Sequence, residues 1–111
     1  MTDTLLILTN LPDPASAERL ATTLVETGLA ACVNILAPCH SVYRWQGAVE
    51  KATEIPLLIK TQRARYAEVE AALRSQHPYA LPEIIALPIT AGLPAYLDWV
   101  RQATEGPCAV C

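Results

Sequence analysis

The segment from His77 to Ile89 constrains the fold more than any other part of the chain, because its prolines separate a helix end from a strand. Pro78 disfavours helical geometry at the residue before it, so a helix arriving from the N-terminal side should end there. Pro82 can open a strand, because the first residue of a strand needs no ladder hydrogen bond from its missing N–H. The apolar run Ile84–Leu87 then predicts a strand covered on both faces, with Glu83 as its one charge.

The rest of the chain alternates between strand and helix patterns. We predict further strands at residues 5–9, 29–36, 41–46 and 48–61, and helices at 14–28, 64–75 and 94–102. Asp13 is the expected N-cap of the first helix, and Gly28 its left-handed end. Gln46-Gly47 is a typical hairpin turn. Pro56 interrupts the long strand, which predicts a bulge or an edge position.

This order predicts an α+β fold, a ferredoxin-like β-α-β-β-α-β sandwich with an extra C-terminal helix. We expect a single domain over residues 1–103 and an irregular tail over 104–111. A chain of 111 residues buries only roughly 65% of its unfolded surface. Charged residues make up 17% of it and hydrophobic residues 52%. So small and apolar a domain is expected to cover its remaining apolar surface by forming an oligomer.

Charge and hydropathy exclude several classes of partner. The net charge is −3 and the basic residues are scattered, so we expect no nucleic-acid partner. No apolar run approaches the roughly 20 residues that span a bilayer, so we expect no membrane partner. The first ten residues lack the basic region and the cleavage site of a signal peptide. The chain is therefore expected to be cytoplasmic, with reduced thiols.

Five blocks in order resemble the CutA divalent-cation tolerance family. They are G-L-A-A-C-V-N-I-L at 28–36, Y-R-W-Q-G-A-V-E at 43–50, L-L-I-K-T at 57–61, the 77–89 segment and Y-L-D-W-V at 96–100. The resemblance implies a homotrimer in which the long hairpin contributes to subunit contacts. It also implies a part in tolerance of, and response to, divalent metal ions, above all copper, a link that is physiological more than chemical. Where metal is bound, we expect the binding to be weak. It implies no agreed reaction, so we expect no enzyme.

The resemblance also identifies positions for metal ligands. Where the family has assigned copper ligands, they are a cysteine near the end of the first strand and a histidine pair before P-Y. In this chain Thr9 stands at the first position and Gln76-His77 at the second, so His77 alone remains. One imidazole does not make a transition-metal site. The alternative for His77 is a capping or interface hydrogen bond at the helix end.

Other candidate ligands lie outside the family pattern. Cys39 and His40 are adjacent after a proline, and Cys108 and Cys111 form a C-x-x-C at the end of the chain. Thiolate and imidazole suit Cu(I) or Zn(II), so we expect copper or another divalent metal at most, and no organic cofactor. The C-x-x-C can equally form a disulfide or be inert.

A set of aromatic and charged residues is not explained by the core of one subunit: Tyr43, Trp45, Lys60, Tyr79, Glu83 and Trp99. One interpretation is subunit packing, with Lys60 and Glu83 buried and each satisfied by a polar partner. The alternative is a cleft between subunits that binds a small anion or metabolite, as in PII-like sensor or adaptor proteins. No Gly-rich phosphate loop supports that alternative. The two histidines form no Ser/His/Asp pattern, which again argues against catalysis.

Overall fold

The computed structural model describes residues 2–106. Within them, strands and helices alternate along the chain as the sequence patterns predict. The elements are β1 (Thr4–Leu11), α1 (Pro14–Glu26), β2 (Cys32–Ile35), β3 (Cys39–Trp45), β4 (Ala48–Gln62), the 3-10 turn η1 (Arg63–Arg65), α2 (Tyr66–Gln76), β5 (Ile85–Pro88) and α3 (Pro94–Ala103).

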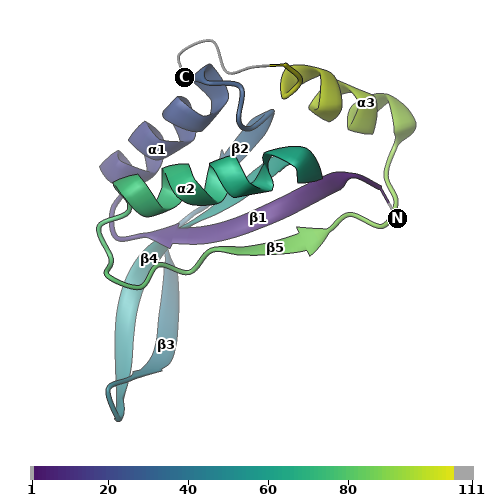
Figure 1. Ribbon diagram of the computed structural model, residues 1–111. Coiled ribbons are helices and arrows are strands. Elements are labelled where there is room, and N and C mark those ends of the chain that lie inside the picture. Colours follow the sequence, from purple (N-terminus) through teal and green to yellow (C-terminus); the bar gives the residue numbers. More distant parts are fainter. Residues whose placement is uncertain (1, 107–111) are drawn as a thin grey trace.

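The strands form one antiparallel sheet in the order β2-β4-β1-β5, with β3 continuing along β4 beyond β2. Helices α1 and α2 lie side by side over one face of this sheet (Figure 1). The distal halves of β3 and β4 leave the sheet as a hairpin that projects from the body of the molecule (Figure 1). The result is a mixed α+β fold with an antiparallel sheet.

Local sequence rules account for where several elements begin and end. Asp13 is the N-cap of α1, because its Oδ1 accepts a hydrogen bond of 2.8 Å from the Ser16 N–H. Gly28 follows that helix with a φ of 74°, in the left-handed region that favours glycine. Gln46 and Gly47 both have positive φ, as a type I′ hairpin turn requires. These three predictions are confirmed.

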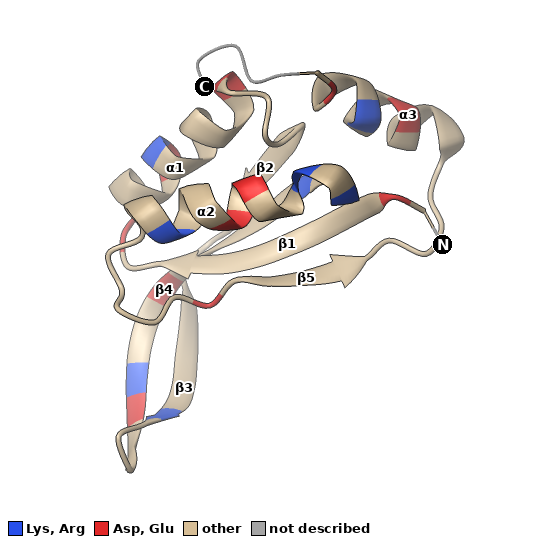
Figure 2. Cartoon of the chain, viewed as in Figure 1, with Lys and Arg blue, Asp and Glu red and all other residues tan. Residues whose placement is uncertain are grey.

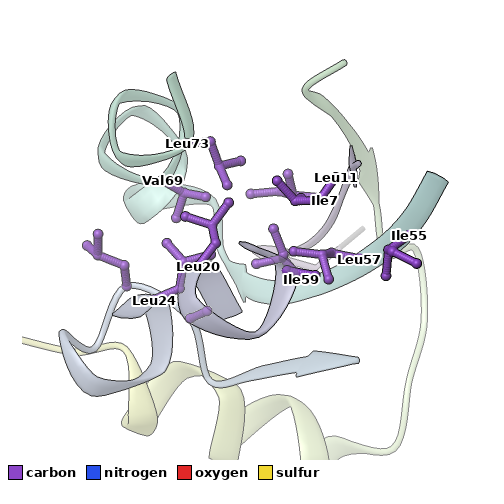
Figure 3. Packing of buried hydrophobic residues seen from close by; sticks show 12 residues of the cluster. Ile7, Leu11, Leu20, Leu24, Ile55, Leu57, Ile59, Val69 and Leu73 are labelled. Carbon is purple, nitrogen blue, oxygen red and sulfur yellow. The ribbon is translucent and has the colours of Figure 1, made fainter. Parts of the chain in front are cut away.

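The core lies between the helices and the covered face of the sheet. Ile7 from β1 and Leu57 and Ile59 from β4 are fully buried there. Leu20 and Leu24 from α1 and Val69 and Leu73 from α2 close over them. Figure 3 shows these side chains pointing toward one another from the sheet and the two helices. Helix and strand periodicities thus bring two apolar stripes onto one apolar sheet face.

Pro56 does not cause the predicted bulge or mark an edge. Its strand, β4, is central, and the register with β1 continues through the Asn10–Pro56 pair without a break. The Pro56 carbonyl accepts a hydrogen bond of 3.0 Å from the Leu36 N–H, just after β2 ends. In an antiparallel strand, the N and O atoms of one residue point to the same side. The missing N–H of Pro56 therefore faces the bend between β2 and β3, where no ladder bond is needed.

The prediction that β5 is covered on both faces is wrong for the single chain. The strand begins at Ile85, and only its alternate residue Ala86, with the preceding Ile84, packs against the core. Ile85 and Leu87 point to the other face and remain about half exposed, at 49% and 48%. By register they lie beside Leu8 and Leu6 of β1. The sheet therefore has a second, apolar face that α1 and α2 do not cover.

Helix α3 and the residues after it close one end of the molecule. Val100 and Thr104 are fully buried. The Gln62 side chain and the Arg65 Nε both donate hydrogen bonds to the Thr104 carbonyl, at 3.1 and 2.7 Å. Thr104, which the sequence pattern places in an irregular tail, is thus anchored to the body. The rest of that tail, from 107 to 111, lies outside the described residues.

Candidate functional site

A cavity of about 870 Å³ lies between the base of the β3–β4 hairpin and the connection from α2 to β5. Tyr43 and Trp45 on β3 and Leu81 in the connection give it apolar walls. Tyr43 and Trp45 lie on one face of the hairpin, together with the β4 residues that pair with alternate residues of β3. Cys39 pairs with Glu54, so the same alternation brings the Glu54 carboxylate to this face.

Two carboxylates supply the charge of this cavity. Glu54 is nine-tenths buried, with 9% of its surface exposed, and Glu83 lies in the connection before β5. Glu83 Oε1 accepts a hydrogen bond of 3.1 Å from the Asn10 side-chain amide at the end of β1. No Lys, Arg or His occurs among the described residues that line the cavity. Figure 2 shows acidic positions where the hairpin leaves the sheet and in the connection to β5.

Tyr79 lies beside Glu54 in the same cavity. Burial raises the pKa of Tyr79 to about 12, and the neighbouring Glu54 carboxylate adds to the shift. The phenol therefore keeps its proton at neutral pH and offers an O–H donor rather than a second negative charge.

His77 is close to this cavity, and both of its ring nitrogens are already hydrogen-bonded. Its Nδ1 accepts from the Tyr79 N–H at 3.2 Å, so the proton resides on Nε2, which donates to the Asn10 carbonyl at 2.7 Å. The imidazole is nine-tenths buried at the C-terminal cap of α2. This is the capping arrangement that the sequence left open as an alternative. A metal on His77 would have to displace one of these two bonds.

The other metal candidates are not brought together in the described residues. Cys39 and His40 are consecutive on β3, so their side chains point to opposite faces of the hairpin. Cys39 Sγ lies 3.8 Å from the Ser41 hydroxyl. Cys108 and Cys111 lie outside the described residues. Within residues 2–106, no group of three or more His, Cys, Asp or Glu side chains is placed to hold a metal ion.

Thr9, at the position of the family's first ligand, is also a poor fit for copper. It is buried at 1% exposure, and its hydroxyl is a buried polar atom without a hydrogen-bond partner among the described residues. A neutral hydroxyl is a hard ligand that does not replace a thiolate for soft Cu(I). The described donor set therefore does not fit the family's copper site.

The aromatic and charged set identified in the sequence divides into two places. Tyr43, Trp45, Tyr79 and Glu83 line the cavity, whereas Lys60 lies toward α3. Lys60 Nζ donates to the Asn34 side chain at 2.7 Å and sits 6.0 Å from the centre of the Tyr96 ring. The expected polar partners of Lys60 and Glu83 exist within the chain, but they are asparagines. The expected burial is not seen in the single chain, where Glu83 is exposed and Lys60 is half-buried.

Sequence reasoning missed several residues of this cavity, among them Asn10 and Glu54. A signal for Glu54 was present, because it is a lone charge directly before the apolar run of β4. Its meaning depends on the loop from α2 to β5 folding back against the hairpin, which no local pattern indicates. Asn10 carried no signal that distinguishes it from an ordinary strand-end residue.

Within residues 2–106, no helix is long and apolar enough to cross a membrane. The longest of them, α1, has 13 residues.

Known proteins resemble this chain over nearly its whole length. A family model described as "CutA1 divalent ion tolerance protein" matches residues 5–103. The divalent-cation tolerance protein CutA of Thermus thermophilus is 44% identical over 98 residues, which cover 88% of this chain and 95% of that protein. Its namesake from Pectobacterium atrosepticum is 41% identical over 101 residues, covering 91% of this chain and 92% of that protein.

A solved structure shows the same likeness in three dimensions. The crystal structure of CutA from Xylella fastidiosa superposes with a TM-score of 0.91 at 43% identity, covering 94% of this chain and all, 100%, of that one. Sequence and structure thus agree across the strands, the helices and the hairpin. The chain belongs to the CutA divalent-cation tolerance family.

Proposed function

We propose that this protein acts in divalent-cation tolerance as a cytoplasmic homotrimer of ferredoxin-like subunits, by binding and without catalysis. The uncovered second face of the sheet carries the proposal. Ile85 and Leu87 are half exposed there, beside Leu6 and Leu8 of the neighbouring strand. A contiguous apolar face of this kind marks an interface, and a homo-oligomer buries it most simply. The number three comes from the family resemblance.

The projecting hairpin supports the same assembly. Val42 and Val49 are 65% and 62% exposed, and nothing in the described part of the chain packs over them. Two-stranded ribbons are marginal in isolation and need a further layer for stability. Contacts between the hairpin and a second subunit would supply that layer.

Light scattering coupled to size exclusion tests this proposal. We expect three times the 12.0 kDa of the chain. Leu87→Glu, which places a charge on the second face, should shift the mass toward that of a single chain. Val25→Glu is the matched control, because Val25 is equally exposed, at 46%, but lies on helix α1. A monomeric wild-type protein at micromolar concentration would contradict the proposal.

We further propose that any binding of copper or another divalent metal is weak or relocated. His77 is engaged at both nitrogens, which leaves Cys39, His40, Cys108 and Cys111 as alternative ligands. Metal content of the purified protein and a calorimetric titration with Cu(I) measure this. The double variant Cys108→Ser, Cys111→Ser should lose most tight binding while it keeps its fold and mass. Unchanged affinity in that variant, with a loss in His77→Ala, would place the site at the helix end.

A second function, small-molecule sensing, is favoured by the cavity beside the hairpin. Its volume of about 870 Å³ suits a metabolite, and apolar walls with a few converging polar groups are typical of ligand sites. Its carboxylates, Glu54 and Glu83, do not favour the small anion suggested by the sequence. Thermal-shift measurements with a panel of cationic, neutral and anionic metabolites would test this function; stabilisation by none of them would contradict it.

A further inference from the structure

The most informative group in the cavity is the buried carboxylate of Glu54. Glutamate is almost never this deeply buried unless it is paired, because removal of a charge from water is costly. The ion pairs within the described residues are Arg65–Glu68 and Arg101–Glu105, and neither includes Glu54 or Glu83. Glu54 therefore lines the cavity without a cationic partner from the described part of its own chain.

The neighbours of Glu54 strengthen the negative character of this wall. Glu83 adds a second carboxylate. The Asn10 side-chain amide donates a hydrogen bond of 3.1 Å to it, which orients the carboxylate. Tyr79 remains a neutral phenol at physiological pH, because burial raises its pKa to about 12. Lysine, arginine and histidine are absent from the described lining. Within the described part of one chain, this wall therefore favours a ligand that carries positive charge.

The apolar residues of the same cavity indicate what else the ligand must offer. Tyr43 and Trp45 are 43% and 42% exposed, and Leu81 is 71% exposed. Aromatic rings favour a cation or a flat apolar group on their faces. A bare divalent metal would need more ligands than two carboxylates and one amide supply, and it would gain nothing from the apolar wall.

We propose that this cavity binds a small organic cation, an ammonium group joined to an aromatic or apolar body. The ammonium lies against Glu54 and Glu83, and the body packs on Tyr43, Trp45 and Leu81. The proposal rests on the second function above, that of a small-molecule sensor, and adds the charge and the chemical class of its ligand.

A matched pair of probes tests the charge of the ligand. 2-Phenylethylamine is the cation, and 3-phenylpropanoate is an anion of nearly the same size and shape. Both are titrated into the full-length protein by calorimetry. Fluorescence is followed in a Trp99→Phe background, where Trp45 in the cavity is the remaining tryptophan. We expect the amine to bind and to perturb Trp45, and the carboxylate to do neither. Binding should weaken as salt is raised, because the Debye length falls.

Matched variants locate the site. Glu54→Gln should lower the affinity for the amine about tenfold, and Glu83→Gln by a smaller factor because Glu83 is more exposed. Glu18→Gln is the control, since Glu18 is exposed on α1 and does not line the cavity. If Glu54→Gln fails to fold, the exposed Glu83→Gln still reports on the site. An affinity unchanged in both cavity variants would overturn the proposal.

Three other outcomes would also overturn it, and they separate it from the function on which it rests. Binding of the carboxylate instead of the amine would leave a small-molecule site of the opposite charge. The double variant Arg44→Ala, Lys51→Ala removes the two cations of the hairpin. If the amine binds only to this variant, the hairpin of a second copy fills the cavity in the wild-type protein. Arg44 and Lys51 lie on the hairpin face opposite Glu50 and Glu54. Binding of neither probe in either form would overturn the proposed organic cation, whereas the sensing function is decided by the thermal-shift panel of metabolites.

Discussion

The two faces of the sheet are built from the same strands but differ in what completes them. On the covered face, Ile7, Leu57 and Ile59 are fully buried beneath α1 and α2. On the second face, Ile85 and Leu87 are half exposed although they flank Ala86, which packs on the core. Because successive residues of a strand point to opposite faces, one apolar run serves both.

The difference separates what a chain buries alone from what it leaves for a partner. The covered face obtains its partners from two amphipathic helices connected by short loops. Among residues 2–106, the second face obtains only α3, which reaches Lys60 and Gln62 at one end. Contacts on the covered face therefore stabilise the single folded chain. Contacts on the second face should stabilise it only when chains associate, so their contribution should depend on protein concentration.

The largest expected effect is a cavity in the covered face. Ile59→Ala removes a fully buried side chain from the centre of β4. We expect a loss of about 3 kcal/mol in the free energy of unfolding, since truncation of buried aliphatic side chains costs roughly 2–5 kcal/mol. Urea unfolding followed by circular dichroism measures it, and the loss should be the same at all protein concentrations.

Leu87→Ala is the matched variant on the second face. It should change unfolding little at low protein concentration and more at high concentration, where copies of the chain associate. Equal, concentration-independent losses in the two variants would mean that both faces are completed within one chain.

A smaller effect is expected at high pH. The pKa of Tyr79 is raised from 10.0 to about 12 by burial and then by Glu54. The folded state therefore holds this proton more tightly than the unfolded state does. Its contribution to stability is complete below pH 10 and is lost as the pH rises through about 12.

Between pH 10 and about 12, the free energy of unfolding should fall less steeply in Tyr79→Phe than in the wild-type protein. Urea unfolding midpoints measured across this pH range test this. Tyr66→Phe is the comparison, because burial and Glu70 also raise the pKa of Tyr66, on helix α2. A profile that responds to Tyr66→Phe and not to Tyr79→Phe would place the alkaline sensitivity on the covered side.

Local chemistry made the ends of several helices and strands predictable from sequence. The cap at Asp13, the helix end before Pro78 and the turn at Gln46-Gly47 each depend on a few adjacent residues, and each is observed. Hydrophobic periodicity also predicted the order of strands and helices. Signals of this kind need no knowledge of distant contacts.

The cavity and the second face were not predictable in the same way. Consecutive apolar residues in β5 look alike whether a helix or another subunit covers them, so Ile85 and Leu87 were assigned to a core that one chain does not form. Glu54 and Glu83 are 29 positions apart, and only the folded loop places both on one cavity. Pro56 lies in a central strand without breaking the hydrogen-bond ladder, because its missing N–H faces the bend between β2 and β3. The sequence pattern does not reveal that bend.

The smallest effect concerns the helix that covers the first face. Asp13→Ala removes the acceptor of the 2.8 Å hydrogen bond from the Ser16 N–H and leaves the first turn of α1 without its cap. We expect a loss of about 1 kcal/mol, the usual cost of deleting an N-cap. Asp98→Ala is the control, because Asp98 is exposed within α3 and its loss should change stability by less than about 0.5 kcal/mol. If the two variants are equally stable, α1 is held by its apolar contacts with the sheet alone, and the covered face is less dependent on local capping than its geometry indicates.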